Sequence, residues 1–175
     1  MSDDKLNVLL YDRQVGTLER SREGINFTYA NTWLEDVRSG RGGHALSISM
    51  PLHEREHGPR VVEPFIAGLL PDSAVHRRKI AESFGIDPGH ESDFEFLRKI
   101  GRDCAGAVVF TDPNDPYADI REPPKLKRLS DGELAQYLRD LPIRPLVDDP
   151  ETGTRLSLAG VNDKTAVVIS GGIVS

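Results

Sequence analysis

Residues 92–111, SDFEFLRKIGRDCAGAVVFT, hold a complete helix signal that runs directly into a strand signal. Ser92 and Glu95 have the spacing of a capping box, in which two side chains satisfy backbone groups at the start of a helix. The apolar residues that follow end at Gly101, a residue type that often terminates helices. Residues 104–111, CAGAVVFT, then predict a buried strand.

The first third of the chain predicts antiparallel β structure. The apolar runs 6–10 and 15–18 are separated by the polar turn 12–14, which is a hairpin signal. In residues 25–29, INFTY, apolar and polar side chains alternate. The stretch 46–52, LSISMPL, places its aliphatic residues on one face and its serines on the other. A period of two predicts strands with one buried face and one wetter face.

Two more helices and a linker complete the predicted fold. Asp72 or Ser73 can cap a helix that ends before Gly85. Ser130 and Glu133 form another capping-box pair ahead of an apolar stripe made of Leu134, Tyr137, Leu138 and Leu141. Between these helices, DPNDPYADIREPPK holds four prolines and little apolar content, which predicts a linker or an exposed loop.

These signals predict an α+β protein. A small mixed N-terminal subdomain, with antiparallel strands and short helices, is expected over residues 1–112. The Pro-rich linker covers 113–128, and the start of a second unit covers 129–175.

Composition and charge limit the classes of function that the protein can have. The formal net charge is −6 and the pI about 5.4, which argues against general binding to nucleic acid. The basic clusters at 77–79 and 125–128 are interpreted as solvated surface.

A single cysteine, Cys104, allows no internal disulfide, so we expect a reducing compartment. The N-terminus lacks a signal peptide and no apolar run approaches a membrane span, so we expect a soluble cytoplasmic protein.

Residues 155–169, RLSLAGVNDKTAVVI, have the composition of a loop that meets phosphate. A Walker loop needs an earlier glycine where Leu158 stands, and it leads into a helix. Here the loop leads into AVVIS, Gly171-Gly172 and IVS, which predicts strand, tight turn and strand. Protein kinases instead fold a glycine-containing loop between antiparallel strands over the phosphates. Spacing alone leaves open both this design and an ordinary hairpin.

Four stretches in a fixed order form a larger pattern. They are ALSISMPL (45–52), FIAGLLPDS (65–73), DFEFLRKIGRDCAGAVVF (93–110) and SLAGVNDKTAVV (157–168). The third holds Ile-Gly-Arg-Asp, a small residue and Gly-Ala-Val, and the fourth holds Ser-x-Ala-Gly-x-x-x-Lys-Thr. Together they resemble the HipA family, the kinase toxins of bacterial toxin–antitoxin modules.

The resemblance implies roles for the second unit. Residues 129–175 would be the start of a kinase-like N-lobe that precedes a helical C-lobe. The ATP phosphate loop would be Ala159, Gly160, Val161, Asn162, Asp163 and Lys164. Ser157 matches the serine that the family phosphorylates in itself, which expels the loop and silences the kinase. In the family, the residues that perform the transfer and bind Mg²⁺ lie downstream of residue 175. We therefore assign no catalytic residue, and we expect this chain alone to be inactive and to bind neither ATP nor Mg²⁺.

The resemblance also implies partners. The intact kinase would phosphorylate a translation-related protein, typically an aminoacyl-tRNA synthetase. A HipB-like helix-turn-helix antitoxin would bind the kinase and make the DNA contacts. The chain would then be the front portion of a larger kinase. The alternative is a stand-alone, non-enzymatic docking module that resembles the first subdomain and binds a partner kinase.

Residues 53–57, HEREH, match both the H-E-x-x-H and the H-x-x-E-H zinc patterns. Both patterns need a helix, so that the two histidines share one face around the metal. Pro51 precedes the segment and Gly58 and Pro59 follow it, which leaves about one and a half helical turns. We therefore expect a solvated loop and no metal.

Two other features are interpreted as structural. Cys104 is expected to be a small core residue. Trp33, Phe27 and Tyr29 are expected in a core or an interface rather than in a ligand platform.

Overall fold

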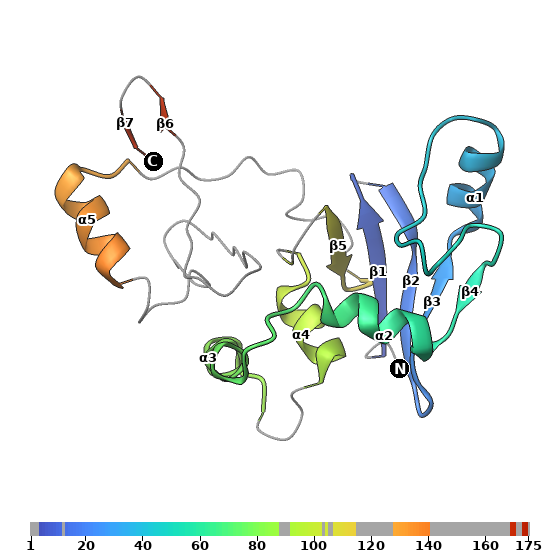
Figure 1. The fold of residues 1–175 in the computed structure, drawn as a ribbon, viewed down its shortest axis with the longest axis horizontal. Coiled ribbons are helices and arrows are strands. Elements are labelled where there is room, and N and C mark those ends of the chain that lie inside the picture. Colours follow the sequence, from blue (N-terminus) through green and yellow to red (C-terminus); the bar gives the residue numbers. More distant parts are fainter. Residues whose placement is uncertain are drawn as a thin grey trace.

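The computed structural model shows an antiparallel sheet with helices packed against it (Figure 1). It describes residues 4–11, 13–87, 92–102, 104, 107–114, 128–140, 169–170 and 173–174. The strands of the main sheet are β1 (Lys5–Leu10), β2 (Arg13–Ser21), β3 (Gly24–Tyr29), β4 (Glu56–His57) and β5 (Val108–Thr111). Their order is β4-β3-β2-β1-β5, and each neighbouring pair is antiparallel. The predicted α+β class is confirmed.

The N-terminal strands form where the sequence predicts them. β1 and β2 make a hairpin in which Leu6 pairs with Leu18 and Leu10 pairs with Arg13. β3 buries every second residue, as its period of two predicts. The apolar side chains of these strands therefore lie on one side of the sheet, where they form part of the core.

The prediction of a strand at residues 46–52 is wrong. This segment forms turns around the hydroxyl of Tyr29, which donates a hydrogen bond to the carbonyl of Met50 (2.7 Å) and accepts one from the amide of Leu46 (3.0 Å). The amide of Met50 also donates to the carbonyl of Ser47 (3.0 Å). These bonds occupy backbone groups that a neighbouring strand would otherwise use, so the alternating pattern does not become a strand.

Replacing Tyr29 by phenylalanine is expected to lower the free energy of unfolding by about 1–3 kcal/mol. The ring keeps its packing, but the amide of Leu46 and the carbonyl of Met50 lose their partner inside the protein. Urea denaturation of the two proteins at pH 7 measures the difference. Equal midpoints would show that the hydroxyl does not hold the loop.

The same pair of proteins has an expected pH dependence. Burial raises the pKa of Tyr29, and the bond from the Leu46 amide lowers it by less. The native state therefore holds the phenol proton more tightly than the unfolded chain does. The stability that this proton contributes is complete below pH ~10, the ordinary tyrosine pKa, and is lost as the pH rises through the raised value. The gap between wild type and Tyr29→Phe should therefore shrink above pH ~10.

Four helices belong to the same body as the sheet. They are α1 (Asn31–Arg38), α2 (Pro59–Ala67), α3 (Ala74–Phe84) and α4 (Asp93–Ile100). Two predicted caps are confirmed: Ser92 Oγ accepts the amide of Glu95 (3.3 Å), and Gly85 ends α3 with φ 62°. Ser73 occupies the N-cap position of α3, but its side chain makes no capping hydrogen bond. Residue Pro59 occupies the first turn of α2, where its missing N–H has no helical partner to lose.

The core lies between the sheet, α2 and α4. Its large, fully buried side chains are Leu6, Leu9, Val8, Val15, Leu18, Phe27, Tyr29, Met50, Ile66, Phe94, Phe96 and Leu97. Trp33 is also buried, so the prediction that Phe27, Tyr29 and Trp33 are core residues is confirmed. Arg20 ties β2 to α4: its guanidinium contacts Glu95 (2.8 Å) and lies 4.8 Å from the ring centre of Phe94.

Two strands of the sheet, β3 and β5, have an amide that is bonded to a group outside the sheet. The amide of Ile25 in β3 donates to a carboxylate oxygen of Glu63 in α2 (3.3 Å). The amide of Phe110 in β5 donates to the carbonyl of Gly101, directly after α4 (2.8 Å). Occupied edge amides disfavour pairing with the strand of another chain.

The strand predicted at residues 104–111 forms only over β5, and the prediction is wrong for Cys104 and Ala107, which lie in bends. Cys104 precedes it and is buried, and its thiol lies within hydrogen-bonding distance of the carbonyls of Val108 (3.3 Å) and Gly101 (3.5 Å). Cys104 is therefore a small core residue, as predicted. None of the described helices is long and apolar enough to cross a membrane.

Candidate functional site

The predicted phosphate loop, residues 159–164, and Ser157 lie outside the described residues. The nearest described elements in sequence are α5 (Asp131–Asp140), β6 (Ile169–Ser170) and β7 (Ile173–Val174). β6 and β7 pair antiparallel, so the predicted pair of strands is confirmed over these four residues, whereas the two glycines between them lie outside the described residues. The described residues after the loop are therefore strands, whereas a Walker loop leads into a helix.

The helix α5, which precedes the loop in sequence, begins with the predicted capping box. The amide of Ser130 donates to the Glu133 carboxylate (2.8 Å), and the amide of Glu133 donates to Ser130 Oγ (3.3 Å). Leu134 is half-buried and Leu138 is 47% exposed, so the apolar stripe is partly in solvent. The side chain of Tyr137, and Leu141, lie outside the described residues.

The HEREH segment does not form the helix that a zinc site of this pattern needs. It begins in a turn at His53 and ends in strand β4 at His57, so the two histidines share no helical face. His53 is exposed, with Nε2 3.6 Å from the Glu54 carboxylate. The prediction of a solvated loop is wrong for His57, which is 4% exposed. No group of three or more metal-binding side chains gathers among the residues that the structure describes.

His57 packs as an aromatic core residue. Its ring stacks on Phe27, with ring centres 6.3 Å apart, and meets the edge of Tyr29 at 5.5 Å. Nδ1 lies 4.0 Å from the carboxylate of Glu54, beyond hydrogen-bonding distance. Nε2 is buried without a hydrogen-bond partner in the described part of the chain. Such an atom lowers the free energy of unfolding, because folding removes its hydrogen bond to water and supplies no other.

Replacing His57 by phenylalanine is expected to raise the free energy of unfolding by about 1 kcal/mol, after a small penalty for the larger ring. The substitution keeps both ring contacts and removes the unsatisfied nitrogen. His53→Phe is the matched control, because that side chain is 76% exposed and should leave stability nearly unchanged. A clear loss of stability in His57→Phe would mean that the imidazole nitrogens are needed.

The basic residues of α3 are partly structural. Arg77 contacts Asp93 of α4 (2.6 Å), donates to the carbonyl of Pro71 (2.7 Å) and lies over the ring of Phe96. This arginine therefore joins α3 to α4. The interpretation of the 77–79 cluster as solvated surface is wrong for Arg77.

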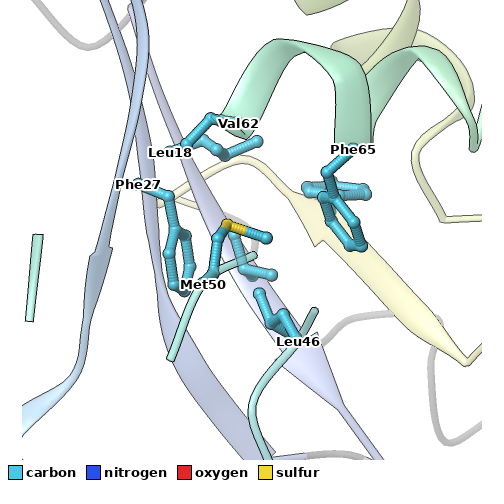
Figure 2. Close-up of a pocket in the computed structure, with 8 residues that line it drawn as sticks. Leu18, Phe27, Leu46, Met50, Val62 and Phe65 are labelled. Carbon is cyan, nitrogen blue, oxygen red and sulfur yellow. The ribbon is translucent and has the colours of Figure 1, made fainter. Parts of the chain in front are cut away.

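Figure 2 shows an apolar gap between α2, the 46–50 loop and the sheet. Its lining residues are Val8, Leu18, Phe27, Leu46, Met50, Val62, Phe65 and Phe110. The gap has no room for a water-sized molecule, and its lining side chains are all apolar. It lacks the convergent polar groups of a ligand site, so it is a packing gap of the core.

Comparison with known proteins identifies the described body. The family model for the HipA N-terminal domain matches residues 6–111, which is more than half of the chain. The chain belongs to the HipA N-terminal domain family. The resemblance to the family is thereby confirmed. The first three of the four sequence stretches lie within the match, and the fourth, 157–168, lies outside it. Within this HipA domain, the match ends at the last residue of β5.

Two similar proteins complete the comparison. The protein named "Putative kinase Y4mE" of Sinorhizobium fredii (strain NBRC 101917 / NGR234) is 34% identical, and the similarity covers 95% of this HipA chain. The chain spans 39% of that protein's length. The solved structure titled "N-terminal domain of HipA toxin" is 21% identical, with a TM-score of 0.45, and the similarity covers 62% of this chain and 91% of that one.

Proposed function

We propose that this chain is the N-terminal portion of a HipA-type serine/threonine protein kinase. One observation carries the proposal: the similarity to the Sinorhizobium fredii protein covers 95% of the chain, whereas the N-terminal domain match ends at residue 111. Likeness to a protein named as a kinase therefore continues into the second unit. In this proposal residues 1–112 are the first subdomain, 113–128 the linker, and 129–175 the start of the kinase-like N-lobe.

The ATP-binding role is assigned to residues 159–164. Ala159 and Gly160 are small enough for backbone amides to approach a phosphate, and Lys164 supplies a positive charge. Asn162 and Asp163 suit a tight turn between strands. ATP and Mg²⁺ would bind in the intact kinase, where the remaining part of the protein supplies the metal ligands and the groups for phosphoryl transfer.

Ser157 is assigned as a site of autophosphorylation. A phosphoserine carries about −1.5 to −2 charges at neutral pH. Placed two residues before Ala159, this charge would repel the ATP phosphates and favour a loop conformation that no longer binds them. Phosphorylation would therefore switch the kinase off.

The partners are proposed by analogy with the family. A HipB-like helix-turn-helix antitoxin would bind the kinase in the cytoplasm and carry most of the DNA contact. The net charge of −6 agrees with this division, because the chain itself is poorly suited to bind DNA. The substrate would be a translation-related protein such as an aminoacyl-tRNA synthetase.

A second function is favoured by one specific observation. The sheet and helices α1 to α4 share a core of their own, and the family match covers only this body. A self-contained body of this kind suits a non-enzymatic docking module that binds a partner kinase. The DNA beyond codon 175 separates the two functions. An open frame that encodes a kinase C-lobe supports the kinase, and a stop codon before a separate kinase gene supports the docking module.

Phosphotransfer by the full-length protein tests the kinase proposal. Incubation with Mg²⁺ and γ-labelled ATP should place label on Ser157, and Ser157→Ala should remove that label. Ser130→Ala is the matched control, because this exposed serine caps α5 and should leave the label in place. A full-length protein that transfers no phosphate to itself or to any protein would overturn the proposal.

A further inference from the structure

Among the residues that the structure describes, His57 is the only titratable side chain that is buried with a polar atom left unpaired. The other histidine of the same segment, His53, is exposed. Imidazoles ordinarily gain or lose a proton between pH 5 and 8, where other side chains keep their charge. The two histidines therefore meet the same proton concentration in very different surroundings.

The groups that contact His57 suit an uncharged ring. An N–H at Nε2 would be buried without an acceptor in the described part of the chain. The ring of Phe27 is centred 6.3 Å away, beyond the distance of about 6 Å at which an aromatic face attracts a cation. Tyr29 carries no charge at neutral and acidic pH, since burial raises its pKa. A positive charge on His57 would therefore lose its hydration and gain little in exchange.

The charged groups of the adjoining elements do not compensate such a charge. Strand β3 has no charged side chain. The first turn of α2, which follows directly, holds Arg60 and no acidic residue, and the N-terminal end of a helix carries partial positive charge. In its own segment, Arg55 and Glu56 adjoin His57 with opposite charges. The carboxylate of Glu54 lies 4.0 Å from Nδ1, but this side chain is mostly exposed and water screens it.

The strand that carries His57 is short enough to open separately from the rest of the sheet. β4 has two residues and lies at the edge of the sheet, beside β3. The amide of Tyr29 adds one backbone bond to this segment, to the carbonyl of Arg55 (2.9 Å). Few bonds therefore oppose opening, and local opening costs less free energy than unfolding of the whole body.

We propose that His57 is a pH-sensitive switch: its uncharged ring holds β4 on the sheet at neutral pH, and its protonation at mildly acidic pH releases residues 53–57. In the released segment the imidazolium is hydrated. The ring of His57 also contacts Tyr29, whose hydroxyl fixes the 46–50 loop, so release loosens the loop beside the apolar gap of Figure 2. The switch lies wholly in the N-terminal body and does not depend on the kinase assignment.

Amide hydrogen exchange, resolved by residue with NMR, tests the proposal at pH 7.5 and pH 5.5. Each rate is divided by the intrinsic rate at that pH, which gives the protection of the Tyr29 amide that Arg55 bonds. If only the open segment takes up a proton, the ratio of open to closed rises about tenfold between these two pH values. Protection at Tyr29 should therefore fall about tenfold. The amide of Phe110, bonded to Gly101 at the opposite edge of the sheet, should keep its protection.

Two variants assign the effect to one histidine. His57→Phe keeps both ring contacts and takes up no proton, so protection at Tyr29 should be equal at the two pH values. His53→Phe is the matched control and should leave the tenfold fall in place. Protection at Phe110 shows in each variant that the body is folded. The proposal is wrong if wild-type protection at Tyr29 does not change with pH, or if its fall persists in His57→Phe. It is also wrong if Phe110 loses protection equally, because acid would then unfold the whole body.

Discussion

Replacing Gly160 by valine in the full-length protein is expected to weaken ATP binding by at least about tenfold, which corresponds to ~1.4 kcal/mol. In the proposed loop the backbone at Gly160 approaches the ATP phosphates, and a β-branched side chain would fill that space. The loss arises from crowding at the site and does not require the protein to unfold. Calorimetric titration with ATP and Mg²⁺ measures the affinity.

The control for this prediction is Gly132→Ala in α5. A Cβ at Gly132 meets nothing within 4 Å, so ATP affinity should not change. In the 175-residue chain, Gly160→Val should hardly alter the melting temperature, because no phosphate is held there. A large stability loss in the chain with unchanged ATP affinity in the full-length protein would mean that Gly160 is only a hairpin residue.

Replacing Gly101 by alanine is expected to destabilise the N-terminal body by about 3 kcal/mol. A Cβ at this position would lie 2.7 Å from Cβ of Phe110 and would collide with the carbonyl oxygen of Leu97. Phe110 and Leu97 are buried, and the amide of Phe110 is bonded to the carbonyl of Gly101, so neither side can move away cheaply. Urea denaturation measures the loss.

Gly68→Ala is a closely matched control. Gly68 ends α2 with φ −69° and ψ −15°, and Gly101 ends α4 with φ −64° and ψ −13°. A Cβ at Gly68 makes only an ordinary contact, 3.4 Å from the carbonyl oxygen of Phe65. Its effect should stay within about 0.5 kcal/mol. Similar small losses at both positions would contradict the close packing of α4 on β5.

Local sequence signals predict those elements whose hydrogen bonds are local. The side-chain cap at Ser92, the capping box at Ser130 and the left-handed Gly85 form as expected, because each is decided within about four residues. The α2 helix was not predicted from its periodicity. Its two prolines suggest a loop, yet Pro59 fits the first turn and the helix is stabilised by burying Val62 and Ile66 in the core.

The wrong predictions have distant causes. The 46–52 segment has the period of a strand, but Tyr29, far away in sequence, supplies bonds that shape it as turns. His57 lies in a polar segment, yet the pairing of β4 with β3 draws its ring against Phe27. Single-sequence patterns contain no information on such long-range contacts. The family was predictable because its motifs are fixed in order and do not depend on these contacts.

The most direct test of the central claim is an experimental structure of the full-length protein with a non-hydrolysable ATP analogue and Mg²⁺. We predict that backbone amides between Ala159 and Asp163 lie within about 3.2 Å of phosphate oxygens, with the Lys164 ammonium beside them. A nucleotide held elsewhere, with this loop more than about 6 Å from every phosphate oxygen, would contradict the assignment of the phosphate loop.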